Sequence, residues 1–273
     1  MPALRHSFYD RSMDQQRPLR VSADTLLCVL VATMTVVALS SCGRSEQSSN
    51  NPTTPAGESL QLITSYSMSI TEPSGLAYSP RTRQLYMVSD ARSAIYVIDT
   101  TGLVLTTIPV VAYDLEGVVL SQNADTFYVA EETLSQITSF LPDGTKIASL
   151  PINVRTNTSH GPEGVTIDSM GHLFVINEQL PAMMLEYSGT TELSRITLSH
   201  TTDISDICYD DATDAFWIVS DESQSVIKIS RAGELLGKWS TPVNQGEGIA
   251  FIGNRMYLVS DADAKLYVFA KPS

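Results

Sequence analysis

The stretch SGLAYSPRTRQLYMVSD, residues 74–90, decides the fold because the chain repeats it. Its first five residues return as EGVVL at 116–120, EGVTI at 163–167, SDICY at 205–209 and EGIAF at 247–251. The second residues of the five copies are 42, 47, 42 and 42 residues apart, and are Gly75, Gly117, Gly164, Asp206 and Gly248. A fixed period near 40 residues is typical of a repeat protein.

Each repeat predicts four short strands. In the first repeat, residues 75–78, 84–89, 94–99 and 103–110 are rich in β-branched and aromatic side chains, with turn residues between them. Four strands in about 42 residues is the period of a β-propeller blade. The chain has four full repeats and a fifth that ends after three strands. We therefore expect an all-β propeller of five four-stranded blades, rather than six blades or two stacked β-sandwiches.

The segment before the first repeat is expected to close the ring. Residues 60–70, LQLITSYSMSI, form one more β-rich stretch, and the fifth blade lacks its outer strand. An N-terminal strand added to the last blade joins the two ends of the chain and protects the sheet edges.

The first 57 residues predict export and tethering. Four arginines within residues 5–20 precede an uncharged apolar stretch at 25–39, which is shorter than the ~20 residues of a spanning helix. Leu39-Ser40-Ser41-Cys42 then resembles the lipobox of bacterial lipoproteins, in which the cysteine is lipidated. We expect residues 1–41 to be a lipoprotein signal peptide, 42–57 a flexible tether and 58–273 the propeller domain. The alternatives are an uncleaved anchor and an ordinary signal peptide.

These features predict a cell-envelope protein that reaches the membrane through a lipid on Cys42. Glycine at position 43, where aspartate is the inner-membrane signal, favours the outer membrane and its periplasmic side. With Cys28 in the signal peptide and Cys42 lipidated, only Cys208 remains, so no disulfide is expected within the propeller. Cys208 lies in an apolar strand and is expected to be a buried apolar residue.

The charge of the chain argues against nucleic acid as a partner. It has 17 basic and 30 acidic residues and a formal net charge of −13. Such a surface repels phosphate backbones and attracts cations or basic partners. Acidic surfaces also serve simply to keep proteins soluble.

Two positions of the repeat are expected to bring acidic side chains to one face. In a propeller the first strand of each blade lines the central channel, and the loop entering it opens on the same face as the loop after the second strand. The inner ring, at the positions that enter the first strands, comprises Ser74, Glu116, Glu163, Ser205 and Glu247. The outer ring, at the ends of the second strands, comprises Asp90, Glu131, Glu178, Asp221 and Asp261. Eight of the ten residues are acidic, and Asp206 adds an acid where the other repeats have glycine.

Crowded carboxylates repel one another, which raises their pKa values unless a cation neutralises them. Ca²⁺ suits such a rim because it takes six to eight oxygen ligands in loose geometry, and the absence of thiols from the set argues against a soft metal. We therefore predict that a divalent cation, Ca²⁺, binds at Glu116, Glu163, Glu247 and Asp206. The alternative, strongest for the outer ring, is that the acids cap backbone N–H groups and fix neighbouring blades.

Two histidines are expected on the same face. His160 lies in the loop before the first strand of the third blade, and His200 in the loop before the first strand of the fourth. They are the candidate general bases if the protein is an enzyme. Their alternative reading is as ordinary exposed loop residues. The sequence has no nucleophile elbow, phosphate-binding loop or zinc-type histidine spacing.

Longer phrases carry a resemblance to a known family, namely residues 72–90, YDLEGVVL at 113–120, GPEGVTID at 161–168, residues 203–223 and QGEGIAF at 245–251. From about residue 60 to its end, the chain resembles the SdiA-regulated, or YjiK/CarP-like, β-propeller family of bacterial envelope proteins. The resemblance implies a periplasmic, often membrane-anchored propeller, with links to calcium responses in part of the family. The family also groups loosely with phytase-like and esterase-like propellers. The lipobox departs from members that carry a membrane helix.

Three functions remain open at this point. The first is a non-catalytic, lipid-anchored envelope propeller that binds Ca²⁺, and an envelope protein or small-molecule ligand, at its acidic face. The second is a metal-dependent hydrolase of the esterase, lactonase or phytase-like type, with a histidine as base. Few basic residues are available for a phytase substrate, and Ser74 and Ser205 stand where a lactonase is expected to have metal ligands. The third is a scaffold in which the acids are structural.

Overall fold

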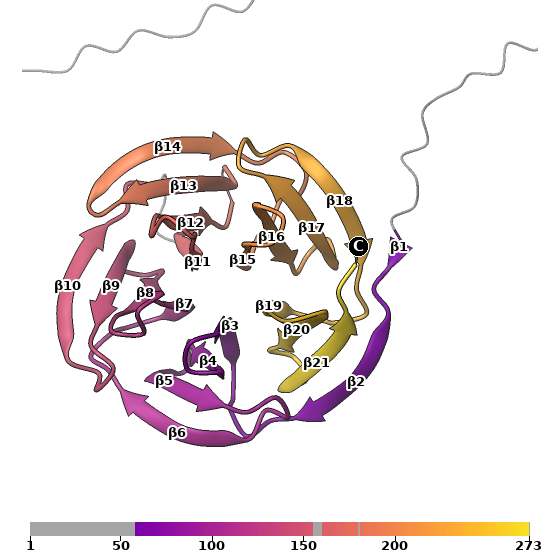
Figure 1. The fold of residues 1–273 in the computed structure, drawn as a ribbon, viewed down its shortest axis with the longest axis horizontal. Coiled ribbons are helices and arrows are strands. Elements are labelled where there is room, and N and C mark those ends of the chain that lie inside the picture. The colour runs from indigo at the N-terminus through magenta and orange to yellow at the C-terminus, as the bar shows by residue number, and fades with distance from the viewer. Residues whose placement is uncertain (1–57, 155–159, 180, 273) are drawn as a thin grey trace, which may run out of the picture. The chain divides into compact units, whose positions relative to one another are not determined.

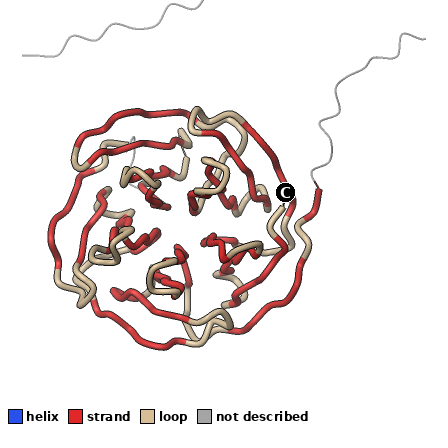
Figure 2. Tube along the Cα trace, viewed as in Figure 1, coloured by secondary structure: helices blue, strands red, loops and turns tan. Residues whose placement is uncertain are grey.

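The computed structural model describes residues 58–154, 160–179 and 181–272. Within these ranges it contains 21 strands and no helix, arranged as five sheets around one axis (Figures 1 and 2). The five-bladed propeller expected from the repeat is confirmed. The expected signal peptide, tether and Cys42 lie outside the described residues. In the part of the chain that the structure describes, no helix is long and apolar enough to cross a membrane.

The strands follow the repeat in chain order, from the channel outward. Blade 1 contains β3 (Pro73–Ser79), β4 (Gln84–Ser89), β5 (Arg92–Ile98) and β6 (Val104–Pro109). Blade 2 contains β7 (Leu115–Leu120), β8 (Phe127–Glu131), β9 (Gln136–Phe140) and β10 (Lys146–Pro151). Blade 3 contains β11 (Pro162–Ile167), β12 (Leu173–Asn177), β13 (Met183–Ser188) and β14 (Thr191–Thr197). Blade 4 contains β15 (Asp206–Asp210), β16 (Ala215–Ser220), β17 (Ser225–Ser230) and β18 (Leu235–Ser240), and blade 5 contains β19 (Gly246–Ile252), β20 (Arg255–Ser260) and β21 (Lys265–Ala270).

The N-terminal strand closes the ring. β2 (Leu62–Ser67) pairs antiparallel with β21 and completes blade 5, as the sequence predicts (Figure 1). A second, shorter strand was not expected: β1 (Glu58–Ser59) runs parallel to the outer strand β18 of blade 4. The first two described strands, β1 and β2, therefore pair with the outer parts of two neighbouring blades. Among the described residues, every strand and every hydrophobic core lies within Glu58–Ala270.

The hydrophobic cores lie between neighbouring blades. Each of the five clusters draws its side chains from two adjacent sheets; the cluster between blades 5 and 1, for example, combines Leu266 and Val268 with Leu76 and Leu85. Both faces of a second strand are therefore covered, and β16 is buried at all six of its positions. This packing explains why the second strands read as continuous apolar runs such as AFWIVS rather than as alternating patterns.

The first strands of neighbouring blades lie very close together near the start of each strand. In four of the five blades there is no room for a side chain at this position. A Cβ on Gly117 would lie 2.5 Å from the carbonyl oxygen of Glu163, and a Cβ on Gly75 would lie 2.4 Å from that of Glu116. Gly164 and Gly248 meet the next strand in the same way. We call these four glycines and Asp206 the glycine layer.

Asp206 fills the centre of the glycine layer instead of binding a ligand at its surface. One carboxylate oxygen accepts hydrogen bonds from the backbone N–H groups of Leu76 (3.2 Å) and Ile249 (3.0 Å), and the other accepts one from Ile207 (2.8 Å). The side chain is 1% exposed. The structure thus places Asp206 below the acidic rim, where it connects blades 4, 5 and 1. Its oxygens are occupied by backbone donors, which does not fit the metal-ligand role expected from the sequence.

Candidate metal centre

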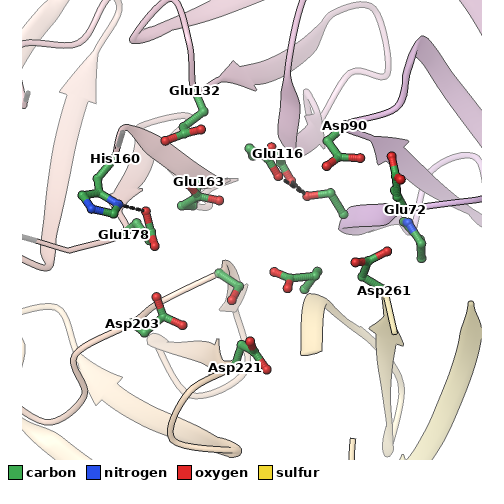
Figure 3. Close-up of a pocket in the computed structure, with 14 residues that line it drawn as sticks. Glu72, Asp90, Glu116, Glu132, His160, Glu163, Glu178, Asp203, Asp221 and Asp261 are labelled. Carbon is green, nitrogen blue, oxygen red and sulfur yellow. Dashed lines mark hydrogen bonds and ion pairs between the residues drawn. The ribbon is translucent and has the colours of Figure 1, made fainter. Parts of the chain in front are cut away.

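An acidic pocket opens at the end of the channel where the first strands begin. It has a volume of about 340 Å³ (Figure 3). Ten carboxylates line it: Glu72, Asp90, Glu116, Glu132, Glu163, Glu178, Asp203, Asp221, Glu247 and Asp261. The remaining lining residues are Pro73, Ser74, Ser205 and His160, so no lysine or arginine of the described residues lines the pocket. We refer to this cavity as the acidic pocket.

All three inner-ring glutamates line the acidic pocket. Burial raises the pKa of Glu116 to about 8 and that of Glu247 to about 7, and neighbouring carboxylates add to both shifts. Burial likewise raises the pKa of Glu163 well above its ordinary value, and the charges of Glu116 and Glu132 reinforce the effect. Without a cation, the folded protein therefore favours the protonated form of these groups.

The two inner-ring serines hold two of these glutamates. Ser74 Oγ donates to Glu116 Oε2 at 2.6 Å, across the boundary between blades 1 and 2 (Figure 3). Ser205 is the equivalent residue at the boundary between blades 4 and 5, and its side chain lowers the pKa of Glu247. Both serines stabilise the charged carboxylate beside them and partly offset the cost of its burial. Serine at these two positions is thus a partner of the glutamate in the next blade. The sequence alone marked these serines only as positions where a lactonase is expected to have metal ligands, and it did not predict this contact.

Four of the five outer-ring residues line the acidic pocket, namely Asp90, Glu178, Asp221 and Asp261. Burial raises the pKa of Asp90 to about 6, with Glu72 as the main neighbouring charge, and burial also raises the pKa of Asp261. These side chains come from loops that follow the second strands, as the repeat predicts (Figure 3).

Glu131 is the exception, and the prediction for it is one residue out of register. Its side chain is 0% exposed and accepts hydrogen bonds from the Tyr113 backbone N–H (2.8 Å), from Gln136 (2.8 Å) and from Thr138. Glu132, the next residue, lines the pocket instead. The pairing explains this: Glu131 is the last paired residue of its second strand, opposite Leu115, as Ser89 is opposite Pro73. A small polar residue before the acid in the other blades was the signal for the correct register.

Two further acids of the acidic pocket were not expected. Glu72 and Asp203 lie two residues before Ser74 and Ser205, so each blade that has serine in the inner ring also carries an acid just upstream of it. Asp203 accepts a hydrogen bond from the backbone N–H of Glu222 at 3.2 Å, yet burial and the nearby Glu178 raise its pKa to about 6. Reading the repeat two residues further upstream finds this position.

The two candidate histidines separate in the structure. His160 lines the acidic pocket, and its Nδ1 lies 2.6 Å from Glu178 Oε2 (Figure 3). His200 does not line it, because its Nε2 lies 3.2 Å from the carbonyl oxygen of Gly233, in the β17–β18 turn of the same blade. Only His160 is therefore placed to exchange a proton with a molecule in the pocket.

Two groups of three carboxylates have the spacing of metal ligands. Asp114, Glu116 and Glu132 form one group, and Glu132, Glu163 and Glu178 form the other, with the oxygens of each group within 4.8 Å of one another. Oxygens on opposite sides of one Ca²⁺ ion are separated by roughly twice the metal–oxygen distance of 2.3–2.6 Å, so this spacing fits the ion. The donors are all oxygens, which also fits a hard cation.

Two solved structures share the fold at low sequence identity. Glutaminyl cyclase of Myxococcus xanthus aligns with a TM-score of 0.59 at 11% identity, over 79% of this chain and 100% of the cyclase. The nidogen/laminin complex contains a chain that aligns with a TM-score of 0.56 at 16% identity, over 73% of this chain and 76% of the other. At this identity the likeness concerns the propeller fold. The SdiA-regulated family model matches residues 63–270, and this chain therefore belongs to the SdiA-regulated family.

Proposed function

We propose that this protein is a calcium-binding module of the bacterial cell envelope. In this proposal the acidic pocket binds Ca²⁺ and through it a partner, either an envelope protein or a small-molecule ligand. The lipidated Cys42 and the tether at 42–57 hold the propeller at the outer membrane, facing the periplasm. Membership of the SdiA-regulated family and the lipobox-like sequence support the envelope location.

The observation that carries the proposal is the collection of ten carboxylates around about 340 Å³ with no basic side chain among the described lining residues. Burial is the main cause of the raised pKa values in this pocket, and repulsion between neighbouring carboxylates adds to it. A divalent cation removes the repulsion by sharing its charge among several oxygens. Glu132 belongs to both groups whose spacing fits an ion, and Glu116 and Glu163 belong to one group each. These three glutamates are the proposed ligands.

The test is a calcium titration monitored by thermal unfolding of residues 58–273, which contain every strand of the ring. We expect Ca²⁺ to raise the unfolding temperature relative to a chelator. A specific ion stabilises the folded state by about 2.7 kcal/mol at a hundredfold excess over its Kd. Isothermal titration calorimetry then gives the affinity and stoichiometry directly. A protein whose unfolding temperature is the same in Ca²⁺ and chelator would show that the acids are structural only.

Matched variants locate the ion. Glu163→Gln and Glu116→Gln remove one charge each from the pocket with little change in shape, and we expect each to weaken Ca²⁺ binding by at least tenfold. Glu234→Gln is the control, because Glu234 is exposed at the β17–β18 turn and lies outside the acidic pocket. Equal affinity in all three variants would place the ion elsewhere.

A metal-dependent hydrolase is the second candidate, and the pair of His160 and Glu178 is the observation that favours it. A carboxylate 2.6 Å from Nδ1 fixes the orientation of the imidazole, which suits a general base beside a cation-binding pocket. The test is turnover of aryl-ester and lactone panels by the calcium-loaded protein. Activity that is lost in His160→Gln and kept in His200→Gln would establish the hydrolase.

A further inference from the structure

A second cavity lies at the opposite end of the channel from the acidic pocket. It has a volume of about 460 Å³ and is lined by the final residues of the first strands of blades 1 to 4 and the turns after them. The glycine layer separates the two cavities, because the first strands meet there backbone to backbone and Asp206 spans the centre. The second cavity is therefore a blind funnel, which we call the lower cavity.

The walls of the lower cavity are mainly apolar. Leu76, Val118, Val165 and Ile207, each one residue past a member of the glycine layer in blades 1 to 4, line the cavity, and so do Ala77 and Val119. Tyr78, Ile167 and Tyr209 widen the funnel toward its mouth. This composition is the reverse of the acidic pocket and is typical of a small-molecule site, where apolar walls carry a few placed polar groups.

The charged groups near the lower cavity are neutralised or lie at its mouth. Asp168 is 1% exposed and pairs with Arg231 at 2.8 Å, and its other oxygen accepts backbone hydrogen bonds from Met170 and His172. Asp211, at the mouth, is exposed to solvent. A bound molecule thus meets no unpaired buried charge, so a neutral ligand is favoured over an ionised one.

Two polar groups remain in the apolar part of the funnel. The Thr166 hydroxyl, 5% exposed, accepts a hydrogen bond from the Tyr209 backbone N–H at 3.1 Å, and its own proton meets no acceptor among the described residues. Beside it, burial raises the pKa of the Cys208 thiol to about 12, so the thiol is neutral and donates only weakly, to the Tyr209 carbonyl at 3.7 Å. Because Thr166 lines the cavity, an oxygen of a bound molecule can accept this proton.

We propose that the lower cavity binds a neutral, largely apolar small molecule that presents one carbonyl or ether oxygen to the Thr166 hydroxyl. The site is separate from the acidic pocket and needs no cation. Its ligand enters from the face opposite the carboxylates, so the propeller binds two chemically different ligands at the two ends of one channel.

The probe for this site is prodan, a neutral naphthalene with one carbonyl oxygen whose fluorescence shifts to the blue in apolar surroundings. We expect saturable binding to residues 58–273 in chelator, with a blue shift, and the same behaviour in Glu163→Gln. Cys208 is the only cysteine of this segment, so its alkylation by neutral iodoacetamide, at an alkaline pH where part of the thiol ionises, reports on occupancy. We expect bound prodan to slow the alkylation at least fivefold, in the segment and in the full-length chain.

Variants test the position and the hydrogen bond. Ala77→Phe fills the funnel and should weaken prodan binding at least tenfold, whereas Leu236→Ser, at an exposed site on β18, should leave it unchanged. Thr166→Val should weaken prodan several-fold but not its analogue with a methylene in place of the carbonyl, and Thr166→Ser should restore prodan binding. Absent binding, or binding that leaves Cys208 alkylation unchanged, would overturn the proposal. The alkylation result decides in the unaltered protein even where a variant fails to fold.

Discussion

At the scale of single residues, Asp206 is a carboxylate whose hydrogen bonds hold neighbouring strands together. Its carboxylate receives three backbone N–H groups from blades 1, 4 and 5, and burial raises its pKa well above the ordinary value in spite of these donors. Asp206→Ala should lower the free energy of unfolding by about 2–4 kcal/mol, because buried donors without an acceptor are costly. Asp206→Asn, which keeps one acceptor oxygen, should lose less.

Chemical denaturation in chelator measures both variants, with the exposed Asp211→Ala as the control. An Asp206→Ala protein as stable as the control would contradict the structural role and return Asp206 to the list of candidate metal ligands.

The repeat predicted most of the candidate site, but it misplaced Glu131, Asp206 and His200 and did not indicate Glu72 or Asp203. Glu116, Glu163 and Glu247 line the acidic pocket because the repeat fixes where each first strand begins. Glu131 does not, because strand pairing rather than phrase similarity decides which residue ends a strand, and a shift of one residue turns a side chain from the pocket to the core. Asp206 could not be assigned from sequence, since two of its three donors lie 43 and 130 residues away.

At the scale of elements, the close approach of the first strands explains the repeated glycine. A Cβ at Gly117 would lie 2.5 Å from the Glu163 carbonyl oxygen and 2.8 Å from the Val165 nitrogen, both of them backbone atoms of the next first strand. Gly117→Ala should therefore destabilise the protein by roughly 1–3 kcal/mol, the usual cost of overpacking. Gly246→Ala is the control, because its nearest neighbours are side-chain atoms at 3.2 and 3.6 Å rather than backbone atoms. Equal unfolding temperatures of the two variants would argue against the close contact.

Ring closure also depends on a single element. β2 covers the edge of β21, and the residues that follow it supply Met68 and Ile70 to the core between blades 5 and 1. Deleting residues 58–70 should abolish cooperative unfolding or cause aggregation, because an exposed strand edge and an open core remain. Deleting only residues 58–59, which removes β1, should have a much smaller effect. Circular dichroism melting and size-exclusion chromatography distinguish these outcomes, and a monomeric, cooperative 71–273 protein would refute the closing role of β2.

At the scale of the whole molecule, the ring brings together acidic side chains that lie about 42 residues apart in the sequence. The period alone was enough to predict five blades and the closing strand, since each blade is a local unit of four strands. What it did not show is that the channel has two ends of opposite character. That difference arises along each first strand, where acids enter above the glycine layer and apolar side chains follow below it, and it emerges only when the five strands are brought together.

The accumulated charge gives the molecule a pH dependence whose sign depends on calcium. The pKa of Glu116 is raised to about 8 and that of Glu247 to about 7, from an ordinary value near 4.5, so the folded state binds more protons than the unfolded state between these limits. The stability that protonation contributes is complete below about pH 4.5 and is lost as the pH rises through 7 and 8. In chelator, the unfolding temperature should therefore fall by several degrees between pH 5.5 and 8.5.

Calcium requires ionised carboxylates, so the stabilisation it gives should increase over the same range. Differential scanning calorimetry of residues 58–273 in both conditions measures the two slopes, and the double variant Glu116→Gln, Glu247→Gln should flatten both. A chelator curve that stays level or rises with pH would mean that the acids of the pocket ionise without a cost from burial or repulsion, which would remove the physical reason for a cation there.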